Sequence, residues 1–167
     1  MVELKKNHPV YVFFNILALT KSNEMSKVST ILARKSTGAF TSPPGLTVFE
    51  ALKTMAEKNI GAIVVADGEK YLGIMTERDY ARKVILENKH SSDTKVDEIM
   101  SKDLPTISPN DTVERCMQLM GEHNVRYLPV FDGDQFAGVI SITDVVNETI
   151  RLQKETISHL KDYIHGQ

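Results

Sequence analysis

The sequence has a single cysteine, no tryptophan, little net charge and no long hydrophobic run. Its one cysteine, Cys116, excludes an internal disulfide and leaves no partner for a cysteine-based zinc site. Lys and Arg number 20 against 22 Asp and Glu, so no large positive field favours nucleic acid or an anionic membrane. The longest apolar stretch, residues 9–19, is shorter than the roughly 20 residues that span a bilayer. These properties predict a soluble, globular, cytoplasmic protein without membrane insertion.

The first 24 residues differ in composition from the rest of the chain. Lys5 and Lys6 precede the apolar run 10–14, a pattern that resembles a secretion signal, but no small-residue cleavage site follows it. We therefore expect residues 1–24 to form an N-terminal arm that is either poorly ordered or docked on the folded part. A cleaved secretion signal is the less favoured alternative.

The chain contains an internal repeat at a spacing of 65 residues. From Thr41 to Asp79, 12 of 39 positions are identical to the residue 65 places further on, whereas unrelated sequences would share about two or three. The turn glycines Gly68 and Gly133 form one of these identical pairs. A unit of roughly 60 residues is marginal alone, so we expect the two copies to share a core.

Each copy predicts the same order of secondary-structure elements. In the first copy, Thr47 is a helix cap, and Asp67–Gly68 is a hairpin turn. The elements expected around them are a short strand, a helix from Val48, strands over 62–65 and 71–75, and a helix over about 77–86. The predicted fold class is α+β, with two βαββα repeats related by a pseudo-twofold axis and a long C-terminal helix. We place the first domain at residues 25–95 and the second at residues 96–167.

Both copies end their second strand with the same short motif. The segments are GIMTERD at 73–79 and GVISITD at 138–144. Two βαββα repeats with this motif in register resemble a pair of cystathionine β-synthase (CBS) domains, from about residue 28 onward. Residues 76–80 and 126–130 are similar to stand-alone CBS pairs that bind adenine nucleotides. The chain departs from the common pattern at Tyr127, where relatives often have His, and at Thr143, where they often have a small residue.

The resemblance implies two nucleotide sites, each combining the motif of one repeat with strands of the other. In such a site the Thr or Ser hydroxyl reaches a phosphate or ribose oxygen, and the Asp carboxylate accepts both ribose hydroxyls. The first site would comprise Ile74, Met75, Thr76, Arg78, Asp79, Arg82, Thr106, Ile107, Arg126 and Tyr127. The second site would comprise Thr41, Ser42, Gly61, Ala62, Val139, Ser141 and Asp144.

Arginine distribution distinguishes the two expected sites. Arg78 and Arg82 lie four residues apart on one helical face, and Arg126 would come from the other repeat, which suits phosphate. Their counterparts in the opposite copies, Thr143, Asn147 and Gly61, are uncharged, so we expect the first site to bind phosphorylated nucleotides more tightly. We expect the second site to hold adenosine but not a phosphate chain. The alternative is that both motifs are only helix caps and the arginines are solvated.

The sequence does not predict catalysis, a metal site or a catalytic cofactor. The five histidines are scattered without zinc-ligand spacing. Cys116 occupies the helical position of Ala51 in the first copy, so we expect a buried core thiol rather than a nucleophile. Met55, Met117 and Met120 lie on helical stripes and are expected to fill the core.

The last helix shows a heptad pattern. Mostly apolar residues recur at spacings of four and three, which is typical of a helix that packs lengthwise on a partner. The positions are Val146, Ile150, Gln153, Ile157, Leu160 and Ile164. We expect this face to form a homodimer contact, and packing on the chain's own N-terminal arm is the alternative.

The residues and the resemblance together predict a non-catalytic sensor. It would act as a homodimer that binds AMP, ATP or NAD(H) and changes how it docks on a partner enzyme or transporter. The alternative is a structural or partner-regulating CBS module with degenerate, ligand-free sites.

Overall fold

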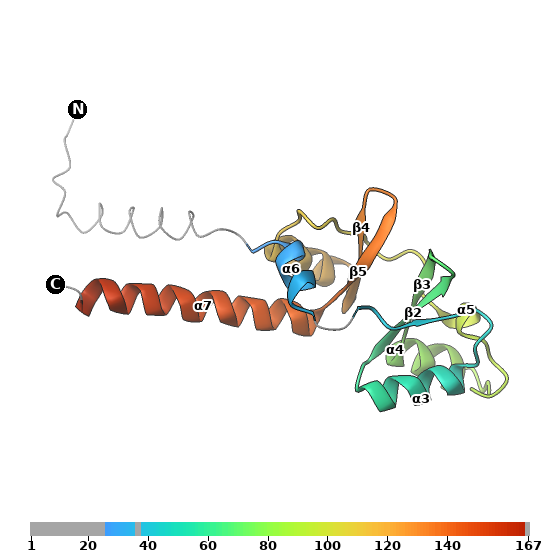
Figure 1. The fold of residues 1–167 in the computed structure, drawn as a ribbon. Coiled ribbons are helices and arrows are strands. Elements are labelled where there is room, and N and C mark those ends of the chain that lie inside the picture. Colours follow the sequence, from blue (N-terminus) through green and yellow to red (C-terminus); the bar gives the residue numbers. More distant parts are fainter. Residues whose placement is uncertain (1–25, 36–37, 166–167) are drawn as a thin grey trace.

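The structure is a computed structural model that describes residues 26–35 and 38–165, with side chains up to Lys161. The expected N-terminal arm lies outside the described residues. The predicted α+β fold is confirmed, because two small sheets with their helices are followed by one long helix (Figure 1).

The first repeat forms a three-stranded sheet of order β1-β2-β3. β1 is parallel to β2, and β2 is antiparallel to β3. The elements are β1 (Thr41–Ser42), α3 (Val48–Lys58), β2 (Ala62–Asp67), β3 (Lys70–Thr76) and α4 (Glu77–Tyr80). The helix predicted over 77–86 changes type after α4 into a π-helix, η1 (Ala81–Ile85), in which the N–H of Leu86 bonds to the carbonyl of Ala81.

The second repeat reproduces four of these elements 65 residues later, and in place of β1 it has an isolated parallel bridge between Ile107 and Val130. The four elements are α6 (Val113–His123), β4 (Tyr127–Asp132), β5 (Gln135–Ser141) and α7 (Ile142–His165). The four start positions are displaced by 65 from those of α3, β2, β3 and α4, and both hairpins contain a register shift at equivalent residues. The duplication seen in the sequence therefore preserves the backbone as well as the motif.

Local capping explains why the repeated helices start and stop where they do. The hydroxyl of Thr47 accepts a hydrogen bond from the N–H of Glu50 at 3.2 Å, and Thr112 caps α6 in the same way. Asn59 and Asn124 end α3 and α6 in the left-handed conformation, with φ of 52° and 53°. Asparagine adopts this conformation more readily than most residues, so both helix ends are encoded locally.

Each repeat has its own hydrophobic core and borrows a short helix for it. α2 (Val28–Arg34) precedes the first repeat, yet Val28 and Ile31 are buried in the core of the second. α5 (Val96–Ile99) precedes the second repeat, yet both of its terminal residues are buried in the core of the first. The single shared core expected from the sequence is therefore replaced by two cores linked through exchanged helices.

Aromatic rings join the two hairpins directly. The ring of Tyr71 stacks on Phe136 at 5.1 Å and meets Phe131 edge-on at 5.4 Å. Burial raises the pKa of Tyr71 to about 12. These contacts hold the tips of the two sheets together.

The expected core residues of the repeated helices are mostly buried. Cys116 is fully buried, and burial raises the pKa of its thiol to about 11, which favours the unreactive protonated form. Met55 and Met120 are buried, but the expectation for Met117 is wrong, because its side chain is 42% exposed. Met117 lines an open groove between α6 and α7 instead.

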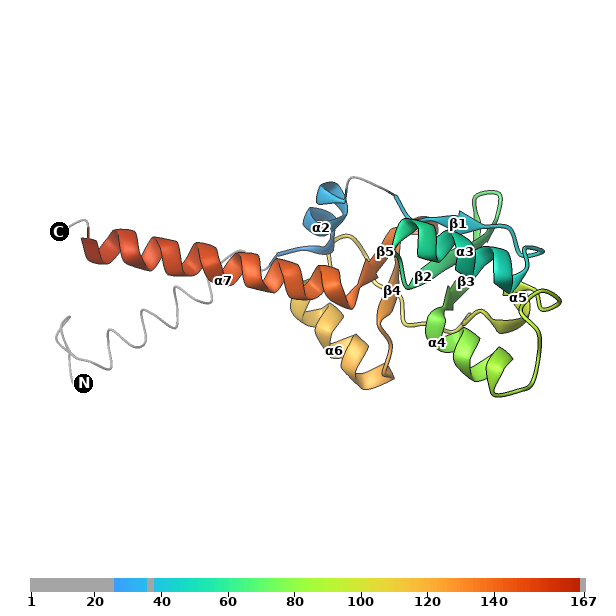
Figure 2. The same ribbon diagram turned by 90° about the horizontal axis from the view of Figure 1, so that it is seen from below.

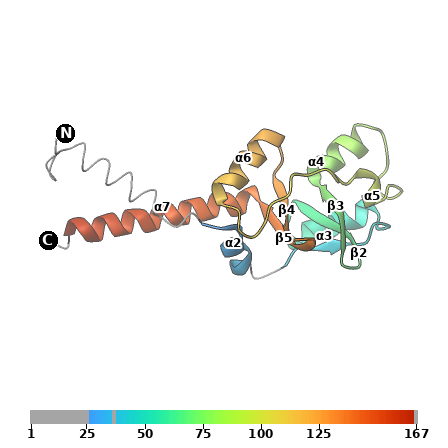
Figure 3. The same ribbon diagram turned by 90° about the horizontal axis from the view of Figure 1, so that it is seen from above.

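Helix α7 extends well beyond the pair of repeats. Its first turns pack on α6 and β5, and the rest projects away from the body (Figures 1 and 2). Seen from above, the two repeats lie side by side with α4 and α6 on the same side (Figure 3). Within the described part of the chain, the far part of α7 therefore lies away from both repeats (Figures 1 and 2).

Candidate functional site

Two pockets lie between the repeats, and Gly61 and Tyr127 line both of them. The first pocket, of about 910 Å³, opens at the start of α4. The second, of about 410 Å³, opens at the start of α7. Both volumes lie in the range of small-molecule sites.

The first pocket is built around the carboxylate of Asp79. Its Oδ2 accepts hydrogen bonds from the backbone N–H of Thr76 at 3.0 Å and from the Thr76 hydroxyl at 2.6 Å. The Thr76 hydroxyl in turn accepts one from the N–H of Asp79 at 3.1 Å, so the pair forms a capping box for α4. Asp79 Oδ1 forms an ion pair with Lys83 Nζ at 2.7 Å and accepts a hydrogen bond from the Ser101 hydroxyl at 3.0 Å. Both carboxylate oxygens therefore already have protein donors.

Basic side chains line the first pocket from two repeats. Arg78 and Arg82 lie on the α4–η1 segment, and Arg126 lies just before β4. Arg78 Nη1 also donates to the carbonyl of Asn124 at 2.8 Å, which links the repeats. With Lys83 included, the basic groups exceed the acidic ones, Glu77 and Asp79, so the pocket favours an anionic ligand.

The second pocket is built around Asp144 in the first turn of α7. Its Oδ2 accepts hydrogen bonds from the backbone N–H and the hydroxyl of Ser141, each at 2.7 Å. Lys35 Nζ also donates to Asp144 Oδ2 at 2.8 Å and to the carbonyl of Val139 at 3.0 Å. Lys35 directly follows α2, so a cation from ahead of the first repeat reaches the motif of the second.

The structure brings together only part of each predicted site. The predicted residues that line the first pocket are Thr76, Arg78, Asp79, Arg82, Arg126 and Tyr127. Those that line the second are Gly61, Ala62, Val139, Ser141 and Asp144. Of the remaining predictions, Met75 and Ile107 are buried in the two cores, and Ile74 lines the second pocket instead of the first. Thr41, Ser42 and Thr106 belong to neither lining within the described part of the chain.

Sequence reasoning missed three polar residues beside the carboxylates. Lys83 lies four residues after Asp79, a helical spacing that predicts an ion pair, so it could have been found. Ser101 reaches Asp79 from the segment after α5. Lys35 is 109 residues from Asp144, and no local pattern in the sequence indicates that contact.

Two glycines allow close approaches near the pockets. A Cβ atom on Gly73 would lie 2.7 Å from the carbonyl oxygen of Ser101, so this motif glycine admits the backbone of the segment after α5. A Cβ atom on Gly61 would lie 2.6 Å from the Tyr127 hydroxyl. Tyr127 thus stands between the pockets, and burial first, then the charge of Glu77, raises its pKa.

Two further features bear on the class of protein. No cluster of three or more potential metal-ligating His, Cys, Asp or Glu residues occurs within residues 26–35 and 38–165. Among the helices of that same part, none combines the length and apolarity needed to cross a membrane.

The fold and the pockets define a class: paired βαββα repeats with ligand-sized pockets between them. The family model for the CBS domain matches residues 29–86 and 96–150. The chain belongs to the CBS-domain family, as a tandem pair. Stand-alone proteins of this kind are generally regulatory.

Known proteins of this family resemble the chain closely. It is 39% identical over 125 residues to the CBS domain-containing protein CBSX3, mitochondrial, of Arabidopsis thaliana, covering 72% of this chain and 61% of that protein. The chain therefore spans about three fifths of that relative. A solved structure of a protein with CBS domains from Burkholderia ambifaria is 43% identical, with a TM-score of 0.71, covering 75% of this chain and 95% of that one.

One solved relative contains ligands. The CBS domain pair of protein MJ0100, in complex with 5′-methylthioadenosine and S-adenosyl-L-methionine, is 25% identical with a TM-score of 0.65. The match covers 75% of this chain and 96% of that one.

Proposed function

We propose that this chain is a non-catalytic sensor that binds adenine nucleotides between its repeats and regulates a partner enzyme or transporter. The main support is an arrangement found twice: a helix-capping carboxylate, Asp79 or Asp144, borders a ligand-sized pocket with a lysine ion-paired to it. A carboxylate can accept the vicinal hydroxyls of a ribose. The adenosine-containing ligands of the MJ0100 domain pair support the same ligand class.

The first pocket is the better furnished for a phosphate chain, as in ATP or NAD(H). It has more than twice the volume of the second, and Arg78, Arg82 and Arg126 surround it. Guanidinium groups bind phosphate oxygens with paired, charge-assisted hydrogen bonds. In this proposal Asp79 accepts the ribose, Thr76 binds a ribose or phosphate oxygen, and Tyr127 borders the base.

Ligand binding would be read out through the arrangement of the repeats. Residues of both repeats line each pocket, so the affinity of a ligand depends on how the repeats are placed. A ligand that binds one arrangement more tightly shifts the population toward it. A partner that docks on one arrangement would sense that shift.

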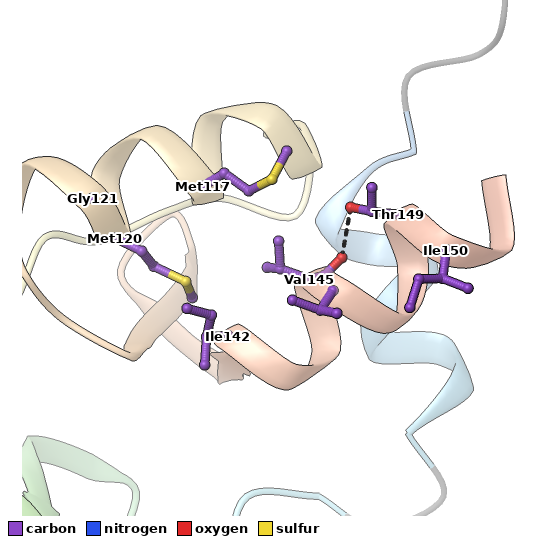
Figure 4. Close-up of a pocket in the computed structure, with 8 residues that line it drawn as sticks. Met117, Met120, Gly121, Ile142, Val145, Thr149 and Ile150 are labelled. Carbon is purple, nitrogen blue, oxygen red and sulfur yellow. Dashed lines mark hydrogen bonds between the residues drawn. The ribbon is translucent and has the colours of Figure 1, made fainter. Parts of the chain in front are cut away.

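We propose that the protein acts as a homodimer through α7. Apolar side chains along this helix are largely exposed: Val146 by 49%, Ile150 by 44%, Ile157 by 51% and Leu160 by 46%. The stripe begins at the apolar groove of about 360 Å³ between α6 and α7 (Figure 4). Contiguous exposed apolar surface of this kind is typical of protein contacts.

Thermal unfolding with added nucleotides tests the proposed function. A ligand at 100 times its dissociation constant should stabilise the protein by about 2.7 kcal/mol. AMP, ADP, ATP, NAD and NADH are each added at millimolar concentration, with guanosine monophosphate as the base control. We expect at least one adenine nucleotide to raise the melting temperature, and the doubly substituted Asp79→Ala, Asp144→Ala protein to lose the response.

The competing function is a ligand-free regulatory module, which the internal capping of both carboxylates favours. It predicts no thermal shift with any adenine nucleotide. A shift that persists in the doubly substituted protein would also contradict the proposed sites.

A further inference from the structure

The cation at the second pocket comes from outside both repeat motifs. Of the described residues that line this pocket, Lys35 is the one Lys or Arg and Asp144 is the one acid. Their ion pair, at 2.8 Å, joins the residue after α2 to the first turn of α7. Among the described lining residues, the pocket therefore has one positive charge, and that charge lies at Asp144, the proposed ribose acceptor.

The two ribose acceptors differ in how fully the protein occupies them. Both carboxylate oxygens of Asp79 accept bonds from the protein. Oδ1 is bonded to Lys83 and Ser101, and Oδ2 is bonded to Thr76. Asp144 instead accepts every one of its hydrogen bonds from the described residues on Oδ2. A ribose hydroxyl can therefore approach Asp144 Oδ1 without displacing a donor from the described residues, whereas at Asp79 it must displace one.

Lys35 can exchange its bond to Asp144 for a bond to a ligand without detaching α2 from the second repeat. α2 is fastened separately, because Arg34 Nη1 pairs with Glu148 at 2.6 Å, and the Ser26 hydroxyl also donates to Glu148. Leu32 packs at Gly138, where an added Cβ would lie 3.0 Å away. The lysine side chain is a compact charge on a flexible four-carbon stem, so its ammonium can turn from Asp144 to a nearby anion.

We propose that the second pocket is a nucleoside monophosphate site in which Lys35 binds the phosphate and determines specificity for AMP over adenosine. The proposal rests on the function proposed above and deepens it. Ribose hydroxyls bind Asp144 Oδ1, and Lys35 moves to the 5′-phosphate. The volume of about 410 Å³ suits one mononucleotide, and the lining is otherwise mainly apolar or uncharged. This departs from the prediction that the second site binds adenosine without a phosphate contact.

Calorimetry with AMP and with adenosine tests the role of Lys35. All proteins carry Asp79→Asn, which removes the charge of the first ribose acceptor while keeping a side chain that can cap α4. Lys35→Met, similar in length but uncharged, should weaken AMP binding roughly ten- to hundredfold, because a charge-assisted contact is lost. Adenosine binding should stay the same or strengthen, because Asp144 is released from its ion pair. Lys35→Arg should retain most of the preference for AMP.

Two controls make the outcomes distinct. Lys27→Met removes an exposed lysine from the same helix region outside the pocket, and it should leave the ratio of AMP to adenosine affinity unchanged. Asp144→Ala should abolish binding of both ligands. An AMP-to-adenosine ratio unaffected by Lys35→Met would overturn the role of Lys35 while leaving the sensor function intact. Absence of binding by either ligand, in the wild type as well, would overturn the proposed function and this site with it.

Discussion

At the scale of single residues, Gly73 is required by packing between backbone segments. A Cβ atom there would lie 2.7 Å from the Ser101 carbonyl oxygen and 3.0 Å from Met100 Sδ. Ile74 and Ser101 exchange backbone hydrogen bonds at this place, so the backbone oxygen cannot move away without breaking them.

Gly73→Ala should therefore destabilise the protein by roughly 1–3 kcal/mol, the usual cost of overpacking. Gly121→Ala is the matched control, because nothing lies within 4 Å of its added Cβ and it lies in helix α6. The control should be neutral or stabilise the protein by up to about 1 kcal/mol, since alanine favours helix over glycine. Urea unfolding measures the stability of both variants. A Gly73→Ala protein as stable as the wild type would show that the close approach at Gly73 does not constrain this position.

The repeated motif made the two carboxylates visible in the sequence but not the lysines paired with them. Asp79 and Asp144 are visible in the sequence because duplication placed them 65 residues apart in one motif. Lys35 was not predictable, because its contact with Asp144 depends on α2 packing on the second repeat rather than the first. Tertiary packing therefore determines which charge meets Asp144, whereas the Lys83–Asp79 pair follows from local helical spacing.

At the scale of secondary-structure elements, ion pairs to the buried carboxylate of Glu148 fasten α2 to α7. Glu148 is 5% exposed and accepts hydrogen bonds from Arg151 Nη2 at 2.7 Å and from Arg151 Nε at 3.0 Å. Hydrogen bonds from Arg151 and then Ser26, with the charge of Arg34, lower the pKa of Glu148 to about 2, although burial opposes them. Its counterpart in the first repeat is Lys83, so the two repeats use this position with opposite charge.

The lowered pKa makes these ion pairs a pH-dependent source of stability. Because the folded-state pKa lies below the unfolded value near 4.5, the stabilisation is present above about pH 4.5 and is lost as pH falls toward 2. The contribution is of the order of 3 kcal/mol. Glu148→Gln should lower the free energy of unfolding at pH 7 and flatten its decline between pH 5 and 2.5, measured in urea. Glu57→Gln, at an exposed position, is the control. If the free energy of unfolding falls with pH in the same way in the wild type and in Glu148→Gln, Glu148 is not the source of this pH dependence.

The order of elements was predictable because hydrophobic periodicity and capping residues act locally. Thr47, Asn59 and their counterparts fix the helix ends without help from distant residues. The π-helix after α4 was not predictable, because residues 77–86 fit an ordinary helix equally well by pattern. The exchange of α2 and α5 between cores was also invisible, because short helices contain too few residues to indicate the surface they pack on.

At the scale of the whole molecule, α2 connects the second pocket and the core of the second repeat to α7. α2 lies in the core of the second repeat, and Lys35 at its end is ion-paired to the first turn of α7. A ligand that draws Lys35 away from Asp144 therefore acts at the base of the projecting helix (Figure 2). If α7 is the dimer contact, nucleotide binding and assembly are linked, and each changes the free energy of the other by the same amount.

The exposed stripe of α7 makes assembly directly testable. Ile157 is 51% exposed in the middle of the projecting part, and a charge there would have to be desolvated against an apolar partner helix. Ile157→Asp should therefore convert a dimer into a monomer, measured as molar mass by light scattering during size-exclusion chromatography. Ser158→Asp introduces the same charge at the adjacent exposed position, away from the heptad positions, and should leave the dimer intact. A wild-type protein that is monomeric at every concentration, or a dimer that survives Ile157→Asp, would mean that this stripe packs on something other than a second copy.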